Sequence, residues 1–405
     1  MTARSLPLFD ACRQRSIVDE LAAFRYGGVT TKCESRFGVP FFFNEFWTSR
    51  QRQGHSLHEV SYRACFKSQL PEFFIERLTS EGDTVHDPFM GRGTTPIQAT
   101  LMGRRAVGND INPLSVFLTR PRTNPPTLGQ LHARLGEIDW KASGDTPDDL
   151  LAFYHPDTLS EISALRTYLL RRDAEGRIDA VDDWIRMVAI NRLTGHSPGF
   201  FSVYSLPPNQ AVSVDAQRKI NAKRNQTPER RNVGDIIVKK SRSLMRDGVH
   251  LPLRPSEFHV AAADKTPDIS DGSVDLVVTS PPFLDVVQYA SDNWLRCWFS
   301  GIDVRDVEIS MHKKPSDWME FVRSVFGELA RVVRPGGHVA FEVGEVRGGR
   351  VDLETLVLEA IAPLAFDPLV VMVNVQEFTK TANCWGVSNN AKGTNTNRIV
   401  VSVRK

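Results

Sequence analysis

A hydroxyl, two prolines and an aromatic ring follow one another at the end of a short apolar run. This stretch, TSPPF at residues 279–283, comes directly after the strand-like residues 274–278. Proline has no N–H to donate to a sheet, so two prolines in succession end the strand and fix an extended backbone. Their carbonyl groups enter no helix or ladder and can point at a ligand. We therefore expect a rigid shelf at the carboxyl end of a buried strand.

A glycine-bearing turn provides a second chemical feature, in the sequence DPFMGRGTT at residues 87–95. Gly91 and Gly93 allow a ligand to approach the backbone closely, and the helix that follows offers its free N–H groups. The turn lacks the third glycine of a dinucleotide fingerprint and the GK[ST] ending of a phosphate-binding P-loop. Asp110 ends the next strand, where its carboxylate can bind both hydroxyls of a ribose. The alternative interpretation of Asp110 is a helix N-cap.

The elements around these motifs alternate between strands and helices, which indicates an α/β protein with a doubly wound, mostly parallel sheet. Strands are expected at 84–87, 105–110, 257–264, 274–279, 338–346, 369–378 and 397–405, and the last two of these could pair antiparallel. Helices are expected at 66–81, 96–102 and 315–333, and the helix at 315–333 ends at the turn RPGG. Ligands collect beyond the carboxyl ends of such strands. DPFMGRGTT, GNDINP, AADKTP and TSPPF all fall at that edge.

Composition places the chain among ordinary globular proteins. Its 405 residues allow one large domain with an insertion, or two domains. No apolar run approaches the roughly 18 residues of a membrane span, and the amino terminus has no apolar core of a signal peptide. The cysteines are isolated, so we expect reduced thiols, a cytoplasmic location and no metal site. They are Cys12, Cys33, Cys65, Cys297 and Cys384.

Positive charge is concentrated between Asp215 and Arg254. This basic stripe has eleven basic and four acidic residues, a net charge of +7, although the whole chain carries only +2. Such a stripe suggests a polyanionic partner. A solvated helical face explains the charge alone equally well. The surrounding residues 121–254 are expected to be largely helical, and residues 1–50 are left without an assignment.

The two motifs together resemble those of the amino-group DNA methyltransferases. HDPFMGRGTT is similar to the S-adenosylmethionine motif of that family, and TSPPF resembles its catalytic (D/N/S)-P-P-(Y/F/W) motif. The segment ACFKSQLPEFF, at 64–74, resembles the sequence that precedes the cofactor motif. The resemblance covers residues 60–118 and 257–345 and does not cover the first 50. Arg92 stands where the family usually has serine.

The resemblance implies a class I methyltransferase fold, in which residues 51–120 form the cofactor-binding half, 121–254 a target-recognition insertion and 255–405 the catalytic half. The implied catalytic residues are Ser280, Pro281, Pro282 and Phe283. The implied cofactor-binding residues are Phe66, Lys67, Asp87, Pro88, Phe89, Gly91, Gly93, Thr94, Asp110, Asn112 and Asp264. The insertion is expected to contact double-stranded DNA through Arg218, Lys219, Lys223, Arg224, Arg230, Arg231, Lys239 and Lys240.

Ser280 bears on the identity of the base. Within the family, SPP is commoner among cytosine-N4 enzymes and DPP or NPP among adenine-N6 enzymes, so methylation of a flipped cytosine is expected. An adenine-N6 enzyme, an RNA amino-methyltransferase and a DNA-binding relative without turnover remain the alternatives. A cognate restriction endonuclease would be a natural partner.

Two other Pro-Pro pairs lack the aromatic ring of TSPPF. The pair at 125–126 is interpreted as a linker, whereas the pair at 207–208 follows an aromatic run that could line the substrate cleft.

Overall fold

The structure is a computed structural model. It describes residues 17–47, 54–62, 65–142, 146–206, 211–248, 255–284, 289–307, 311–347, 349–379 and 392–405. Four features named above lie outside these residues: part of the basic stripe (249–254, with Arg254), the Pro-Pro pair at 207–208, Cys12 and Cys384. None of the described helices is long and apolar enough to cross a membrane.

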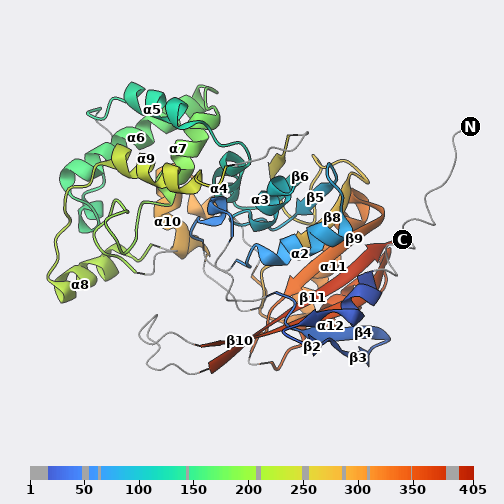
Figure 1. Cartoon of the computed structure of the whole chain (residues 1–405). Helices are drawn as coiled ribbons and strands as arrows, with labels where there is room; N and C mark the ends of the chain where they lie inside the picture. The colour runs from blue at the N-terminus through green and yellow to red at the C-terminus, as the bar shows by residue number, and fades with distance from the viewer. Residues whose placement is uncertain are drawn as a thin grey trace, which may run out of the picture.

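A nine-stranded sheet forms the centre of the larger part of the molecule (Figure 1). Its strand order is β3-β4-β10-β11-β9-β8-β5-β6-β7, and β11 alone runs antiparallel to both of its neighbours, β10 and β9. The predicted α/β sheet and the antiparallel final pair are thereby confirmed. The strands are β3 (Lys32–Arg36), β4 (Val39–Asn44), β5 (Thr84–Asp87), β6 (Arg105–Asp110), β7 (Glu257–Val260), β8 (Val274–Thr279), β9 (Val333–Val343), β10 (Phe366–Thr379) and β11 (Lys392–Arg404).

Apolar helix faces cover both sides of this sheet. One core joins the sheet to α2 (Gln69–Leu78) and α3 (Thr94–Leu101), and a second core joins it to α11 (Pro315–Val332) and α12 (Leu353–Ile361). This two-sided burial explains why the central strands are almost continuously apolar. The order of strands and helices brings the carboxyl ends of β5, β6, β7 and β8 to one edge.

Residues 17–47, left unassigned from the sequence, extend the sheet. A small hairpin, β1 (Arg25–Tyr26) and β2 (Val29–Thr30), precedes β3, while β4 pairs in parallel with β10. The side chain of Asn374 on β10 then accepts a hydrogen bond from the Phe46 N–H at 2.7 Å. The partner strand lies more than 300 residues away, so no local pattern identified this pairing.

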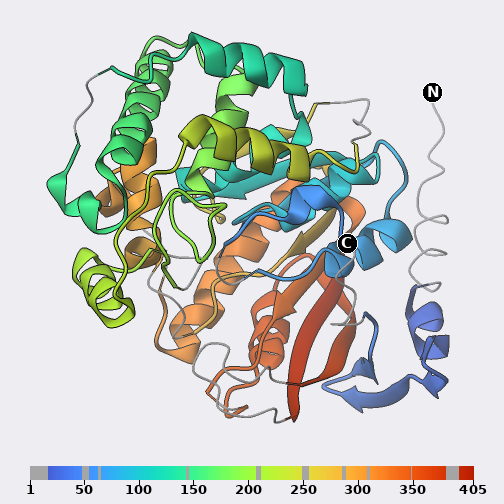
Figure 2. The ribbon, with the colours of Figure 1, turned by 60° about the vertical axis from the view of Figure 1, so that its left-hand side comes forward.

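The helical insertion forms a second lobe beside the sheet (Figure 2). Its helices are α5 (Leu128–Glu137), α6 (Pro156–Ala174), α7 (Ala180–Ile190), α8 (Val214–Arg224) and α9 (Val233–Leu244), reached through α4 (Pro113–Thr123). Three short 3-10 turns are η1 (Ser56–His58), η2 (Asp148–Ala152) and η3 (Val304–Asp306). The Pro-Pro pair at 125–126 links α4 to α5, as predicted.

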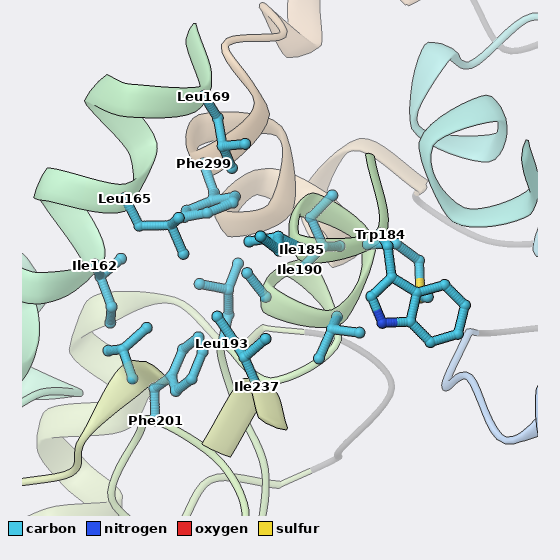
Figure 3. Packing of buried hydrophobic residues seen from close by; sticks show 14 of the residues in the cluster. Ile162, Leu165, Leu169, Trp184, Ile185, Ile190, Leu193, Phe201, Ile237 and Phe299 are labelled. Carbon is cyan, nitrogen blue, oxygen red and sulfur yellow. The ribbon is translucent and has the colours of Figure 1, made fainter. Parts of the chain in front are cut away.

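Later chain completes the core of this lobe. Helix α10 (Tyr289–Ser300) places Leu295 and Phe299 in the same buried cluster as Ile162, Leu165 and other insertion side chains (Figure 3). The helical lobe is therefore built from two chain segments, one on each side of the TSPPF motif.

Three predicted boundaries are wrong. The expected turn at 334–337 is a bulge inside β9, because Val274 pairs with Val333 and Leu276 with His338, which leaves four residues unpaired. Strand β7 ends at Val260 instead of residue 264, and the alanines and aspartate that follow turn towards the site. The helix expected at 66–81 spans only Gln69–Leu78.

Candidate active site

The TSPPF shelf is fastened to the glycine turn. The Thr279 hydroxyl donates to Asp87 Oδ1 at 2.6 Å, and the Thr95 hydroxyl donates to the Val278 carbonyl at 2.9 Å. The Pro282 carbonyl accepts a hydrogen bond from the Trp318 indole at 2.8 Å, which uses one of its two lone pairs. The Pro281 carbonyl accepts none from the described residues and remains available.

A buried carboxyl group lies beside the shelf. Glu342 is on β9, next to β8, and its carboxylate accepts hydrogen bonds from the Ser280 hydroxyl and from Asn397 Nδ2, the latter at 2.6 Å. Burial raises the pKa of Glu342, while the two hydrogen bonds oppose that rise. We did not identify Glu342 from the sequence, although a lone acid within the apolar run HVAFEV was the available signal.

Asp110 organises the glycine turn. Its Oδ2 accepts from the Gly91 N–H at 2.8 Å and its Oδ1 from the Asn112 N–H at 2.9 Å, while burial raises its pKa. The N-cap of α4 is Asn112, which accepts from the Leu114 N–H, so the N-cap alternative for Asp110 is wrong. Gly93 has φ +79°, and a Cβ there would lie 2.3 Å from the Thr119 hydroxyl.

One cavity connects these motifs at the carboxyl edge of the sheet. Eight of the expected cofactor or catalytic residues line it directly; they are Pro88, Phe89, Gly91, Asp110, Asn112, Asp264, Ser280 and Pro282. Three further lining residues, Ile111, Ala262 and Ala263, lie in the segments GNDINP and AADKTP that were expected at this edge. The lining residues that sequence reasoning missed are Tyr62 and Phe321. Phe321 comes from α11 with no local signal.

Other expected site residues lie outside the lining. Asp87 is fully buried behind it, and burial raises its pKa to about 7. Thr94 and Gly93 stand at the start of α3, Phe66 packs against the core under α2, and Lys67 is exposed.

The Phe283 ring is half-buried at the end of the shelf. It packs against Gly344, where a Cβ would lie 2.7 Å from the ring. Pro281 is buried beneath the cavity and does not line it.

The basic stripe divides into paired and unpaired cations. Arg218, Arg230, Arg231, Lys240 and Arg246 form ion pairs with nearby acids. Within the described part of the stripe, the residues without a carboxylate partner are Lys219, Lys223, Arg224, Lys239 and Arg242. Three of these five are on α8, of which Gln217 is the one buried residue, so α8 presents the largest share of uncompensated charge.

Parts of the chain are similar to known proteins. A family model described as DNA methylase matches residues 37–116, which extends the similarity further towards the amino terminus than the motifs indicated. The Type II methyltransferase M.BsoBI of Geobacillus stearothermophilus is 23% identical over 307 residues, or 65% of this chain and 57% of the relative. The Type II methyltransferase M.MjaII of Methanocaldococcus jannaschii is 39% identical over 69 residues, which are 17% of this chain and 13% of the relative.

These matches support the predicted resemblance to the amino-group DNA methyltransferases. The match spans little more than half of the length of M.BsoBI. Among solved structures, the rRNA methyltransferase aviRa from Streptomyces viridochromogenes has a TM-score of 0.32 and 12% identity, covering 86% of this chain and 89% of that one.

S-adenosylmethionine is the cofactor that the two motifs predict, and the chemistry of the cavity fits it. The charged side chains of the lining are Asp110 and Asp264, and no basic residue is among the lining residues. Two carboxylates suit the hydroxyl and amino donors of an adenosine and the positive charge of a sulfonium. The apolar side chains Phe89, Ile111 and Phe321 suit the purine ring.

Proposed function

We propose that this methyltransferase modifies the exocyclic N4 amino group of a cytosine flipped out of double-stranded DNA. The observation that carries the proposal is the position of Ser280. Its side chain lines the cofactor cavity and its hydroxyl proton is directed to the buried Glu342 carboxylate. An amino group placed on the shelf would thus lie between the cofactor and a proton acceptor.

The shelf residues act on a weak nucleophile. The lone pair of an exocyclic amino nitrogen is delocalised into the base, and in duplex DNA the base is also stacked and paired, so it must be flipped out. Ser280 Oγ, which donates its own hydrogen to Glu342, keeps lone pairs that accept one amino N–H. The Pro281 carbonyl can accept the other. These two bonds pull the nitrogen towards tetrahedral geometry and free its lone pair.

S-adenosylmethionine, when bound, supplies the electrophilic methyl group. After the nitrogen gains a methyl group it must lose a proton. The Ser280 hydroxyl takes that proton as it passes its own to Glu342, so charge balances without a covalent enzyme intermediate. A carboxyl group with a raised pKa suits this role, because it binds the proton more firmly than an exposed glutamate.

Family resemblance supports cytosine over adenine, because the motif is SPP. The relatives named Type II methyltransferases support a role beside a restriction endonuclease that acts on the same site. One relative, from Bacillus amyloliquefaciens, is named the orphan methyltransferase M.BamHII, which supports a solitary role equally.

The function is tested by incubating the protein with S-adenosylmethionine labelled in its methyl group and with separate pools of duplex DNA and RNA. We expect label in the DNA pool. Label in the RNA pool alone would show that the substrate is RNA and not DNA. Label in neither pool, with cofactor binding intact, would indicate a relative without turnover.

A further inference from the structure

A second, more open pocket lies where the helical lobe meets residues of the cofactor-binding half. It measures about 440 Å³ and is lined by residues 58–62 together with Arg92, Arg192 and Lys240. Tyr62 lines this cavity and the cofactor cavity, so the two are neighbours. We call it the basic cavity.

Arg192 is a cation held in place without a counter-ion. Its guanidinium lies 3.9 Å from the centre of the Phe200 ring, and its Nε donates to the Asn191 carbonyl. It has no carboxylate partner within the described part of the chain, and its Nη atoms donate no hydrogen bond there. Burial and the neighbouring Arg296 lower the pKa of Arg192 to about 10. The environment of Arg192 therefore disfavours its charge.

Lys240 is the second cation of the basic cavity. Its side chain is 13% exposed, and its Nζ is 3.5 Å from Glu59 Oε2. Glu59 also pairs with Arg246, at 2.6 Å, so its charge is shared. Burial and the nearby Arg192 lower the pKa of Lys240. Positive charge thus exceeds negative charge inside the basic cavity.

Two further arginines donate hydrogen bonds to backbone carbonyl groups of the segment 58–62. Arg92, in the glycine turn, donates to the Val60 carbonyl at 3.0 Å, and Arg296 donates to the Ser61 carbonyl at 3.1 Å. Arg92 has no carboxylate partner among the residues that the structure describes, whereas Arg296 interacts electrostatically with Asp292. Buried like charges are costly unless an anion accompanies them. Glu59 is the only acid among the described residues that line the basic cavity, so an anionic ligand would balance the remaining positive charge.

We propose that the basic cavity binds a phosphate of the DNA backbone next to the flipped nucleotide, through Arg192 and Lys240. This inference rests on the proposed function. Arginine and lysine are the usual phosphate ligands, and guanidinium geometry matches two phosphate oxygens. The site differs from α8, because it lies beside the reaction cavity and its cations are mostly buried. A phosphate held there would fix the strand at the point where the base leaves the stack.

The test uses Arg192→Gln and Lys240→Gln in the full chain, with Arg171→Gln as the matched control. Arg171 is an exposed arginine of α6 outside the basic cavity and the basic stripe. The affinity for a DNA duplex that the wild-type protein methylates is measured over a series of KCl concentrations. S-adenosylmethionine affinity by calorimetry and the melting temperature of each variant are measured in parallel.

Each cavity variant should bind DNA more weakly and with a salt slope flatter by about 0.9, the value for one lost phosphate contact. The control should keep the wild-type slope, and all variants should bind the cofactor as wild type does. Weaker cofactor binding with an unchanged DNA slope would overturn the proposal, because the anion would then be the carboxylate of the cofactor. Lys240 is the less buried of the two positions, and an unchanged salt slope in Lys240→Gln would also overturn the proposal. Methylation of DNA by the wild type would in that case leave the proposed function intact.

Discussion

At the scale of single residues, the account depends on Ser280 and Glu342. Replacing Ser280 with alanine removes the hydroxyl that joins the amino group to Glu342 and leaves the core intact. Turnover should fall by about 1–3 kcal/mol of transition-state stabilisation, the scale of one hydrogen bond to a charged group. Cofactor affinity should not change. Single-turnover kinetics and calorimetry separate the two effects, and a fall in cofactor affinity alone would remove Ser280 from the chemistry.

Glu342 makes turnover depend on pH. Its carboxyl group can accept a proton only when ionised, and its pKa is raised by burial. The wild-type rate should therefore fall as pH is lowered towards that pKa. Glu342→Gln should be slow at every pH and should lack this acidic limb. An acidic limb of equal size in the glutamine variant would assign the titration to another group.

Asp87 predicts a pH dependence of stability. Its pKa rises from 3.8 to about 7 on folding, so the folded state holds the proton more firmly than the unfolded state. The resulting stabilisation is complete below pH 3.8 and is lost as pH rises to about 7. Asp87→Asn should reduce this loss in urea unfolding between these pH values. An equally steep loss in the variant would contradict the assignment.

At the scale of elements, we propose α8 as the outer contact surface for DNA. Its Lys219 and Lys223 are exposed and have no ion-pair partner within the described chain, whereas Arg230 is near both Asp157 and Glu161. Replacing both lysines with glutamine should flatten the salt slope of DNA binding by up to about 1.8. Arg230→Gln should change it less. Equal slopes for wild type and the double variant would make α8 an ordinary solvated face.

The motifs and the strands that carry them could be predicted from the sequence, since alternation, glycine and proline act locally. Glu342 could not, because its role depends on the register that sets β9 beside β8. The extension of the sheet by β4 depends on pairing with β10 across the whole chain. Likewise, charge counting located the basic stripe but could not show that Arg230 is neutralised by acids from α6.

At the scale of the whole molecule, the helical lobe and the catalytic half share α10. Phe299 is buried in the lobe while its helix follows the catalytic motif by only a few residues. Phe299→Ala should destabilise the protein by about 3–5 kcal/mol through the cavity that it leaves. DNA binding should weaken at a temperature where cofactor binding is kept. Equal loss of both would show that the two parts unfold together.

The central claim is that TSPPF, backed by Glu342, directs a methyl group to an exocyclic amino nitrogen of DNA. The most direct measurement is mass spectrometry of nucleosides from duplex DNA treated with the protein and deuteromethyl-labelled S-adenosylmethionine. The account predicts labelled N4-methylcytosine, formed by wild type and strongly reduced in Glu342→Gln. Labelled N6-methyladenine would correct the base and keep the mechanism. Label on a ring carbon, or equal N4-methylcytosine from wild type and Glu342→Gln, would contradict the account.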